Sequence, residues 1–295
     1  MKNNRSGNVL LGLTLIFVGL AWMLLKLGYL DDRAIMGLAI TWPLVFVIFG
    51  LGVIFKNRVL TSILWIIFII ATISYGYVFD KQVENFEISY SDHEIVEDYN
   101  GGKMELNIAA GNILITSTEN QLISSEYPEF ISEDFDVKDG KVKFEYKDTT
   151  KGYFDFIQRT NEEFKFKLND DLNWDIDIDC GAMDGTFDLR DIYINNLEID
   201  TGASDITLYL SEKSDLSTID IDNGVSDIVV FVPDGVGVSL DYDGAIKDVD
   251  IEEDSWSKKD GYYYSPGYEE SLKKTIILVD SGVGSIEFKF LDSDE

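Results

Sequence analysis

Acidic side chains recur at fixed spacing in the last two hundred residues and are the strongest candidates for chemistry. Asp177, Glu198 and Asp220 occupy matching places in three copies of one phrase, WDIDIDCGAMDGTFDL, LEIDTGASDITLYL and TIDIDNGVSDIVVFV. If the copies stack as strands, these carboxylates form a column with ~4.8 Å between neighbours, where like charges repel unless they are screened or bridged. Oxygen ligands can bind extracellular Ca²⁺ weakly, so the column is a candidate calcium site. The alternative is a solvated acidic face that keeps the domain soluble.

Side chains for nucleophilic or acid–base catalysis are scarce. His93 is the only histidine and Cys180 the only cysteine. Histidine triads, Cys–His pairs and histidine zinc sites therefore lack partners, and no disulfide can form within the chain. Cys180 lies beside Asp177 and Asp179, whose negative charge opposes thiolate formation. We therefore expect no catalytic residue, no cofactor and no enzymatic activity.

Aromatic residues gather in the region 252–274, which contains EDSWSKKDGYYYSPGYEESLKK. Trp256, Tyr262, Tyr263 and Tyr264 could contact a partner, because aromatic side chains are enriched where proteins meet. Alternatively, the segment folds back over an open end of the stack, since edge strands need a cover. Both interpretations remain open at this point.

The elements that carry these residues are strands. In Leu197, Ile199 and Thr201 every second residue faces one way, which is the period of a strand with one buried face. Glycine then permits a sharp corner, an aspartate follows whose carboxylate can accept hydrogen bonds from turn N–H groups, and the alternation resumes. The predicted turn residues are Gly111, Gly181, Asp184, Gly202, Asp205, Gly224, Asp227, Gly244 and Gly282.

The regular spacing of the glycines predicts a repeat architecture. From Gly181 to Gly244 the intervals are 21, 22 and 20 residues, and Gly282 follows 38 residues later. A unit of about 21 residues with two short strands cannot bury its aliphatic face alone, so the units should stack around a shared core. We predict an acidic all-β solenoid over residues 101–295, preceded at 81–100 by a linker or first strand.

The first eighty residues differ in character. Three apolar runs, at about 9–30, 34–55 and 59–79, each approach the ~20 residues that a membrane-spanning helix needs. We therefore predict a three-helix transmembrane region over residues 1–80. Basic residues before the first run and between the second and third favour a cytoplasmic N-terminus and an extracytoplasmic β domain, in a multi-pass protein of the bacterial cell membrane.

The charge is also divided along the chain. Residues 1–80 carry six basic and three acidic residues, and the remainder carries 18 basic and 51 acidic residues. So acidic a domain repels nucleic-acid phosphates, which excludes nucleic acid as a partner. The partners expected instead are the membrane itself, a protein within the membrane, and weakly bound calcium or a cationic peptide.

Several phrases resemble a known family, the bacterial LiaF-like cell-envelope stress proteins. The resemblance lies in WPLVFVIFGLGVIF, in MELNIAAG, in the phrases LEIDTGASDITLYL and TIDIDNGVSDIVVFVPDGVGV, and in VDSGVGSIEFKF. It implies a few N-terminal spans followed by a β-solenoid "toast-rack" domain. It further implies a role in envelope-stress signalling, in some members as a restraint on a sensor histidine kinase. Related toast-rack domains are also labelled adhesins, so capture of cations, cationic peptides or wall polymers without signalling is the alternative.

Overall fold

The computed structural model divides the chain into two compact units, Met1–Asn85 and Phe86–Glu295. Each unit is described by itself. The structure describes residues 41, 44–48, 51, 64–65, 67–68, 71–72, 87–96, 98–149, 162–251 and 255–291.

The prediction of a three-helix transmembrane region over residues 1–80 is wrong for the described residues of the first unit. Its described residues are helical, and the longest consecutive stretch is 44–48. Among the described residues, none belongs to a helix that is long and apolar enough to span a bilayer. The hydropathy of a 20-residue window reports how apolar a segment is, but it does not report the length of helix that forms. The other residues of the runs 9–30, 34–55 and 59–79 lie outside the described residues.

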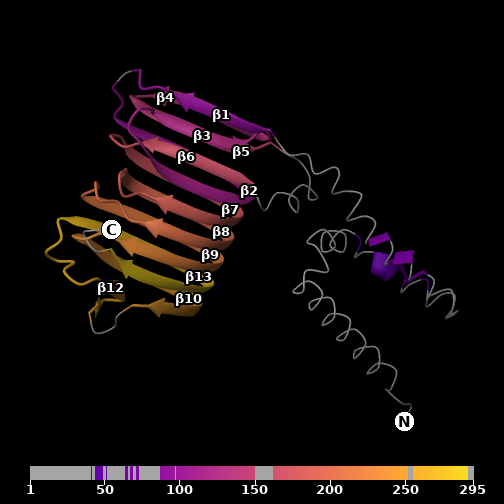
Figure 1. Ribbon diagram of the computed structural model, residues 1–295. Helices are drawn as coiled ribbons and strands as arrows, with labels where there is room; N and C mark the ends of the chain where they lie inside the picture. The colour runs from indigo at the N-terminus through magenta and orange to yellow at the C-terminus, as the bar shows by residue number, and fades with distance from the viewer. Residues whose placement is uncertain are drawn as a thin grey trace, which may run out of the picture. The chain divides into compact units, whose positions relative to one another are not determined.

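The described part of the second unit is built of strands, and six of them have 15 residues or more (Figure 1). Within the described residues, a strand is also present at 88–93, inside the segment predicted as a linker or first strand. The strands are β1 (Ile88–His93), β2 (Gly101–Thr118), β3 (Ile123–Pro128), β4 (Ile131–Lys138), β5 (Lys141–Asp148), β6 (Glu163–Asn169), β7 (Asn173–Asp188), β8 (Tyr193–Tyr209), β9 (Leu216–Val232), β10 (Val236–Asp250), β11 (Ser257–Lys259), β12 (Tyr262–Tyr264) and β13 (Lys273–Phe290).

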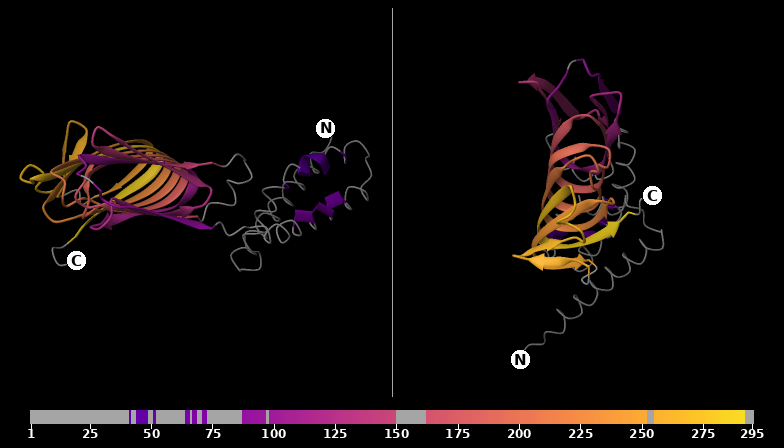
Figure 2. Two further views of the ribbon diagram at one scale, coloured as in Figure 1. Left: turned by 90° about the horizontal axis from the view of Figure 1, so that it is seen from above. Right: turned by 90° about the vertical axis from the view of Figure 1, so that its left-hand side faces the viewer.

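Each long strand bends near its middle and contributes to two facing layers. In β2 the first half, Gly101–Asn107, pairs with β5, whereas the second half, Asn112–Thr118, pairs with β6. Figure 2, seen from above, shows the two layers enclosing a narrow interior. Every second side chain of both halves points inward, as the alternating burial of β8 and β9 shows. The domain is therefore a flattened β-solenoid, as the sequence predicted.

The stacking order departs from the chain order at one place. The long strands pair in parallel in the order β2, β7, β8, β9, β13, β10. The last strand, β13, is inserted between β9 and β10 and pairs with both of them along most of its length. In consequence, β10 and not the last strand lies at the C-terminal end of the stack.

The two ends of the stack are covered differently. At the N-terminal end, β1, β3 and β6 extend one layer and β4 and β5 extend the other, with antiparallel pairs among them. At the other end, the hairpin β11–β12 pairs with β10 through Ser239 and Leu240. One continuous hydrophobic core runs between the layers through all the long strands.

Candidate functional site

Stacked glycines form the corners at which the strands bend. The register of β7, β8, β9 and β13 aligns Gly181, Gly202, Gly224 and Gly282 in one column. A Cβ added at Gly202 would lie 2.7 Å from the carbonyl oxygen of Gly181, and one at Gly224 would lie 2.6 Å from that of Gly202. None of the four has a positive φ. Glycine is required here because neighbouring backbones approach too closely for any side chain.

Two of the predicted corner glycines do not belong to this column. Gly244 pairs with Ser281, which leaves Ala245 opposite Gly282. Gly111 pairs with Met183, and the corner position of β2 is therefore Ala109. At Gly111 an added Cβ would lie 2.4 Å from the Phe164 ring, so this glycine makes room for a core aromatic side chain. The spacing of glycines in the sequence could not distinguish a glycine required by close backbone contact at a corner from one that makes room for a core side chain.

Aspartates flank the corners on both sides; we call this surface the acidic corner. Before the glycines, the register aligns five exposed aspartates in one column, and after them it aligns four more, with Ser285 occupying the β13 position. The first column is Asp179, Asp200, Asp222, Asp280 and Asp243, and the second is Asp184, Asp205, Asp227 and Asp248.

The aspartates after the glycines do not form the expected turn hydrogen bonds. The described side-chain hydrogen bonds at the corner come from residues before glycine: Thr201 Oγ1 donates to the carbonyl of Ala203 at 3.2 Å, and Cys180 Sγ donates to that of Ala182 at 3.2 Å. Asp227 Oδ1 instead accepts a hydrogen bond from Ser285 Oγ of the neighbouring rung at 2.7 Å. The carboxylates of this column therefore project outward and remain available to solvent or a partner.

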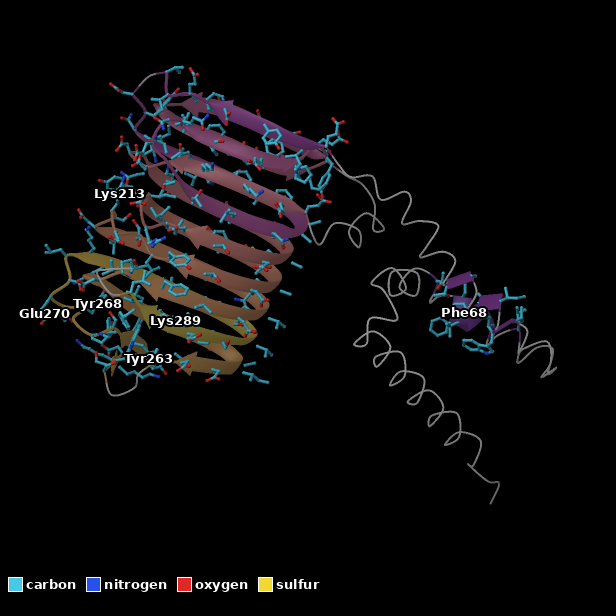
Figure 3. The ribbon with its side chains drawn as sticks, in the orientation of Figure 1. Phe68, Lys213, Tyr263, Tyr268, Glu270 and Lys289 are labelled. Carbon is cyan, nitrogen blue, oxygen red and sulfur yellow. The ribbon has the colours of Figure 1, made fainter. Side chains whose placement is uncertain are left out.

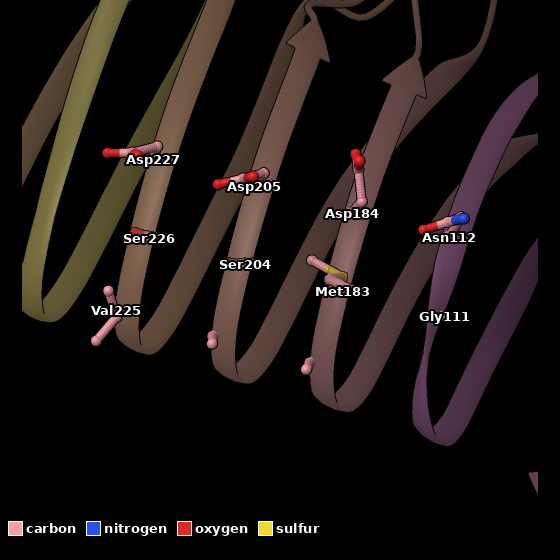
Figure 4. Close-up of a pocket in the computed structure, with 11 residues that line it drawn as sticks. Gly111, Asn112, Met183, Asp184, Ser204, Asp205, Val225, Ser226 and Asp227 are labelled. Atoms are coloured by element: carbon pink, nitrogen blue, oxygen red, sulfur yellow. The ribbon is translucent and has the colours of Figure 1, made fainter. Parts of the chain in front are cut away.

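A shallow groove runs along the acidic corner, and its lining combines small apolar residues with Ser204, Ser226 and the aspartates that follow the corner (Figure 4). The residue after each corner position, which is glycine in β7, β8, β9 and β13 and Ala245 in β10, is exposed or half-buried. It increases in size along the stack, from Ala182 and Ala203 to Val225, Val283 and Ile246. Ile246 is 67% exposed and Val225 is 55% exposed. The acidic corner thus presents an apolar ridge between two lines of negative charge, an arrangement that suits an amphipathic basic partner.

The calcium candidates align as predicted but do not converge. Asp177 pairs with Glu198, and Glu198 pairs with Asp220. Asp177 Oδ2 lies 3.7 Å from Lys103 Nζ, so part of its charge is compensated. Burial and the charges of Asp222 and Asp200 raise the pKa of Asp220. In the part of the chain that the structure describes, no group of three or more acidic, histidine or cysteine side chains is placed to hold a metal ion.

The interior of the corner is polar, which the sequence analysis missed. Ser281 Oγ donates to Asn223 Oδ1 at 2.6 Å. Ser204 Oγ, Ser226 Oγ and Asn223 Nδ2 are buried and have no hydrogen-bond partner among the residues that the structure describes. Cys180 lies in the same interior column, and burial raises the pKa of its thiol to about 11. Cys180 is therefore a packed, unreactive residue, as expected.

The aromatic segment covers the end of the stack. Trp256 is only 8% exposed, and its ring centroid lies 4.9 Å from that of Phe288. Tyr263 and Tyr264 pair through β12 with β10 and are half-buried, and the ring centroids of Tyr264 and Tyr268 lie 4.9 Å apart. Figure 3 labels Tyr263 and Tyr268 at this end of the domain. Of the four predicted partner contacts, Trp256 is thus buried, and Tyr262, Tyr263 and Tyr264 keep partial exposure.

A second cluster that the sequence did not reveal lies at the N-terminal end. His93 Nε2 lies 2.7 Å from Glu133 Oε1, and Tyr127 OH donates to Glu133 Oε2 at 2.7 Å. Tyr146 OH donates to Ser125 Oγ and to Glu133 Oε1. Burial and the contact with Glu133 raise the pKa of Tyr127. The cluster joins β1, β3, β4 and β5, so its role is to hold the strands of this end together.

Two family models match the chain. The first is described as the N-terminal domain of toast_rack and matches residues 79–231, which is more than half of the chain. The second is described as "Cell wall-active antibiotics response LiaF, C-terminal" and matches residues 175–288. All the aspartates of the acidic corner lie within the second matched range, and those of β7, β8 and β9 also lie within the first. No curated protein matches the sequence.

Solved structures of two bacterial proteins align with this chain. A "putative cell adhesion protein" from Clostridium sporogenes aligns with a TM-score of 0.60 and 18% identity over 70% of this chain and 100% of its own. A "putative adhesin" from Bacteroides fragilis is 13% identical over 69% of this chain and 97% of its own, with a TM-score of 0.19. At these identities the first likeness establishes the fold and nothing further, and the second carries no argument.

Proposed function

The chain belongs to the family of proteins with a LiaF-like toast-rack domain, and from this membership we propose that it is a non-enzymatic regulator of the bacterial cell-envelope stress response. The observation that carries the proposal is the match of the LiaF C-terminal model to residues 175–288. That range contains the strands that form most of the acidic corner, so the family match and the most distinctive surface coincide.

A regulator of this kind acts through a protein partner, and we propose a sensor histidine kinase as that partner. The acidic corner supports such a contact, because it combines exposed apolar side chains with a dense negative charge. Electrostatic complementarity of this sort increases association rates and discriminates between partners. Binding would shift the population of the kinase between its active and inactive states by the difference in affinity for the two.

Envelope association follows from the same family membership, and we propose that the β domain faces the extracytoplasmic side. The strong negative charge supports this side, because it keeps a domain soluble and away from anionic surfaces. Labelling of a cysteine introduced at exposed Asp200 with a membrane-impermeant maleimide in intact cells tests it. Labelling only after lysis would contradict the proposal.

The test of the regulatory role is the basal expression of an envelope-stress regulon in a deletion strain. We expect altered expression, restored by the wild-type chain and not by a variant with Asp200→Asn and Asp222→Asn in the acidic corner. The matched control carries Glu129→Gln and Asp134→Asn, two exposed acidic residues far from the corner along the stack. Unchanged expression in the deletion strain would rule out regulation.

The alternative is a module that captures cations, cationic peptides or wall polymers without sending a signal. The continuous acidic columns favour it, because they need no partner protein to attract positive charge. In that case the deletion strain would show unchanged regulation and altered sensitivity to cationic peptides. The variant with Asp200→Asn and Asp222→Asn also distinguishes the two functions, because it removes charge from the corner without touching the core: it should change regulon expression if the domain regulates, and only peptide sensitivity if the domain captures cations.

A further inference from the structure

The outermost long strand of the stack, β10, has an open edge. On one side β10 pairs with β13 from Val236 to Asp250. On the other side β12 covers only Ser239 and Leu240. Within the described residues, no strand pairs with Asp243–Asp250 on that side. An unpaired edge offers backbone N–H and C=O groups to a further strand, and recognition by strand addition uses such edges.

The side chains of this edge are the ends of the corner columns. Asp243 ends the column before the glycines, Asp248 ends the column after them, and Ile246 ends the apolar ridge. All three are exposed, as is Asp250. Residues 241–250 contain four aspartates and one lysine. Natural edge strands usually carry charges that discourage pairing with themselves, and here the charges are almost all of one sign.

We propose that the open edge of β10 binds an extended basic segment of a partner protein, which adds to the stack as one more parallel rung. Charge complementarity selects this occupant: basic residues would face Asp241, Asp243, Asp248 and Asp250, and an apolar residue would extend the ridge beyond Ile246. Opposite charges on neighbouring strands stabilise the pair, whereas like charges destabilise it. The proposal concerns direct binding and holds whether or not the domain regulates a stress response.

A second copy of the chain fits this edge poorly. Antiparallel pairing of two β10 edges about a two-fold axis between Ala245 and Ile246 would place Asp243 opposite Asp248 and Asp241 opposite Asp250. Each of these contacts sets like charges face to face. The edge therefore discriminates against self-association and in favour of a positively charged strand.

The geometry specifies a probe peptide. Its sequence is Lys-Val-Lys-Ser-Gly-Val-Ser-Lys-Val-Lys. The four lysines lie opposite the four aspartates of β10, and one valine lies beside Ile246. The other two valines occupy the positions that face the interior. Glycine occupies the corner, because a Cβ at this position in β13 would lie 2.6 Å from the carbonyl oxygen of the preceding rung. The control peptide has glutamate in place of lysine. Binding of the labelled peptides to the purified full-length chain is measured by fluorescence anisotropy.

We expect the basic peptide to bind and the acidic peptide not to bind. The double variant Asp243→Lys and Asp248→Lys should weaken binding by at least ~10-fold, because two attractive cross-strand pairs become repulsive. The matched control, Asp200→Lys and Asp205→Lys, makes the same change in the same columns on β8. It lies three strands from β10, about 14 Å away, beyond the screening length of about 8 Å at physiological salt. We expect less than a ~2-fold change in this control.

Amide hydrogen exchange gives a readout that does not depend on the variants. Bound peptide should protect backbone N–H groups of Asp241–Asp250 more than those of β8. Equal losses of affinity in both double variants, without local protection, would show a diffuse attraction to acidic surface and overturn the proposal. Absence of binding by the basic peptide would also overturn it, and neither result would bear on the regulon test.

Discussion

The two ends of the solenoid are stabilised by different means. At the N-terminal end, β4 and β5 are held by side chains: Phe144 stacks on Phe135, and Lys143 Nζ bridges Glu105 at 2.7 Å. In the later rungs β8, β9 and β13, the interior is aliphatic and the corners depend on backbone contact between glycines. The first region can tolerate irregular strand lengths, whereas the second requires each rung to repeat the one before it.

Charge separates the two regions in the same way. Residues 101–169 contain thirteen acidic and nine basic residues, whereas residues 173–250 contain nineteen acidic and three basic residues. In the first region Lys103, Lys143 and Lys147 alternate with Glu105 and Glu145 as a ladder of ion pairs. In the second, aspartates align with aspartates. A surface that costs stability through repulsion and is repeated in five rungs is better explained by binding than by folding.

The largest expected loss of stability comes from a substitution that separates the backbones of two adjacent rungs in the repeating region. Gly224→Ala adds a Cβ 2.6 Å from the carbonyl oxygen of Gly202, so adjacent rungs must separate. We expect the free energy of unfolding to fall by about 3 kcal/mol, the upper part of the range for overpacking. Chemical denaturation of the full-length chain measures it. The control Ala203→Val adds methyl groups at the exposed position after the corner and should change stability by less than about 0.5 kcal/mol. Equal effects would show that the close approach at Gly224 is not required.

The next largest loss of stability is expected when the hydrogen-bonded side-chain cluster at the N-terminal end is disrupted. Glu133→Ala removes the acceptor for Tyr127 OH and one acceptor for Tyr146 OH, and also the contact with His93. Leaving a partly buried hydroxyl unsatisfied costs 1–3 kcal/mol, so we expect a loss of about 2 kcal/mol. The neighbouring exposed residue gives the control, because Asp134→Ala should change stability by less than about 0.5 kcal/mol. A smaller loss at Glu133 than at Asp134 would refute this role.

Much of the repeating region was predictable from the sequence. Alternation in LEIDTGASDITLYL specifies two strands with one buried face, and the glycine at its centre specifies a corner. The alignment of Asp177, Glu198 and Asp220 followed from the matching positions of these residues in the three copies of the repeated phrase. A sequence repeat of this kind works because each rung sees the same neighbours, so local pattern and tertiary contact agree.

The remainder depended on contacts between residues far apart in the sequence. The insertion of β13 between β9 and β10 could not be predicted, because the period of the sequence repeat does not specify which strands lie next to each other. The same holds for His93 and Glu133, forty residues apart, which meet because β1 and β4 close the same end. Gly244 was assigned to the wrong corner position because a shift of one residue in register leaves the glycine spacing almost unchanged.

Acidity should affect the two regions in opposite directions. Burial opposes ionisation of Glu105, but hydrogen bonds from Lys103 and Lys143 outweigh it and lower its pKa below the ordinary 4.5. Its stabilising contribution is therefore present at neutral pH and is lost as pH falls through the lowered pKa. The pKa of Asp220 is raised above 3.8, so the folded state holds this proton more tightly and stability declines as pH rises through that window.

Two single variants make this difference measurable. At pH 7, Glu105→Gln should destabilise the chain and Asp220→Asn should stabilise it, each by less than about 1 kcal/mol because both sites are screened by solvent. Both effects should vanish in urea unfolding at a pH below the carboxyl pKa values. If the two variants shift stability in the same direction at pH 7, the charge contrast between the regions is wrong.

The smallest expected effect decides whether the acidic columns hold calcium. Screening and specific binding both relieve repulsion among Asp177, Glu198 and Asp220, but only specific binding distinguishes Ca²⁺ from other cations. Because the carboxylates are spread along a ladder, we expect millimolar Ca²⁺ to raise the melting temperature no more than NaCl of equal ionic strength. A calcium-specific rise that disappears on addition of a chelator and in Glu198→Gln would instead establish a site. Repeating the measurement with Asp134→Asn controls for calcium at unrelated carboxylates.

The location of any stabilisation by salt sharpens the contrast between the two regions. Because acidic and basic residues already pair in the N-terminal region, little charge repulsion is left there for a salt to screen. Stabilisation by either salt should therefore come from the later rungs, where amide hydrogen exchange of β8 and β9 would slow first.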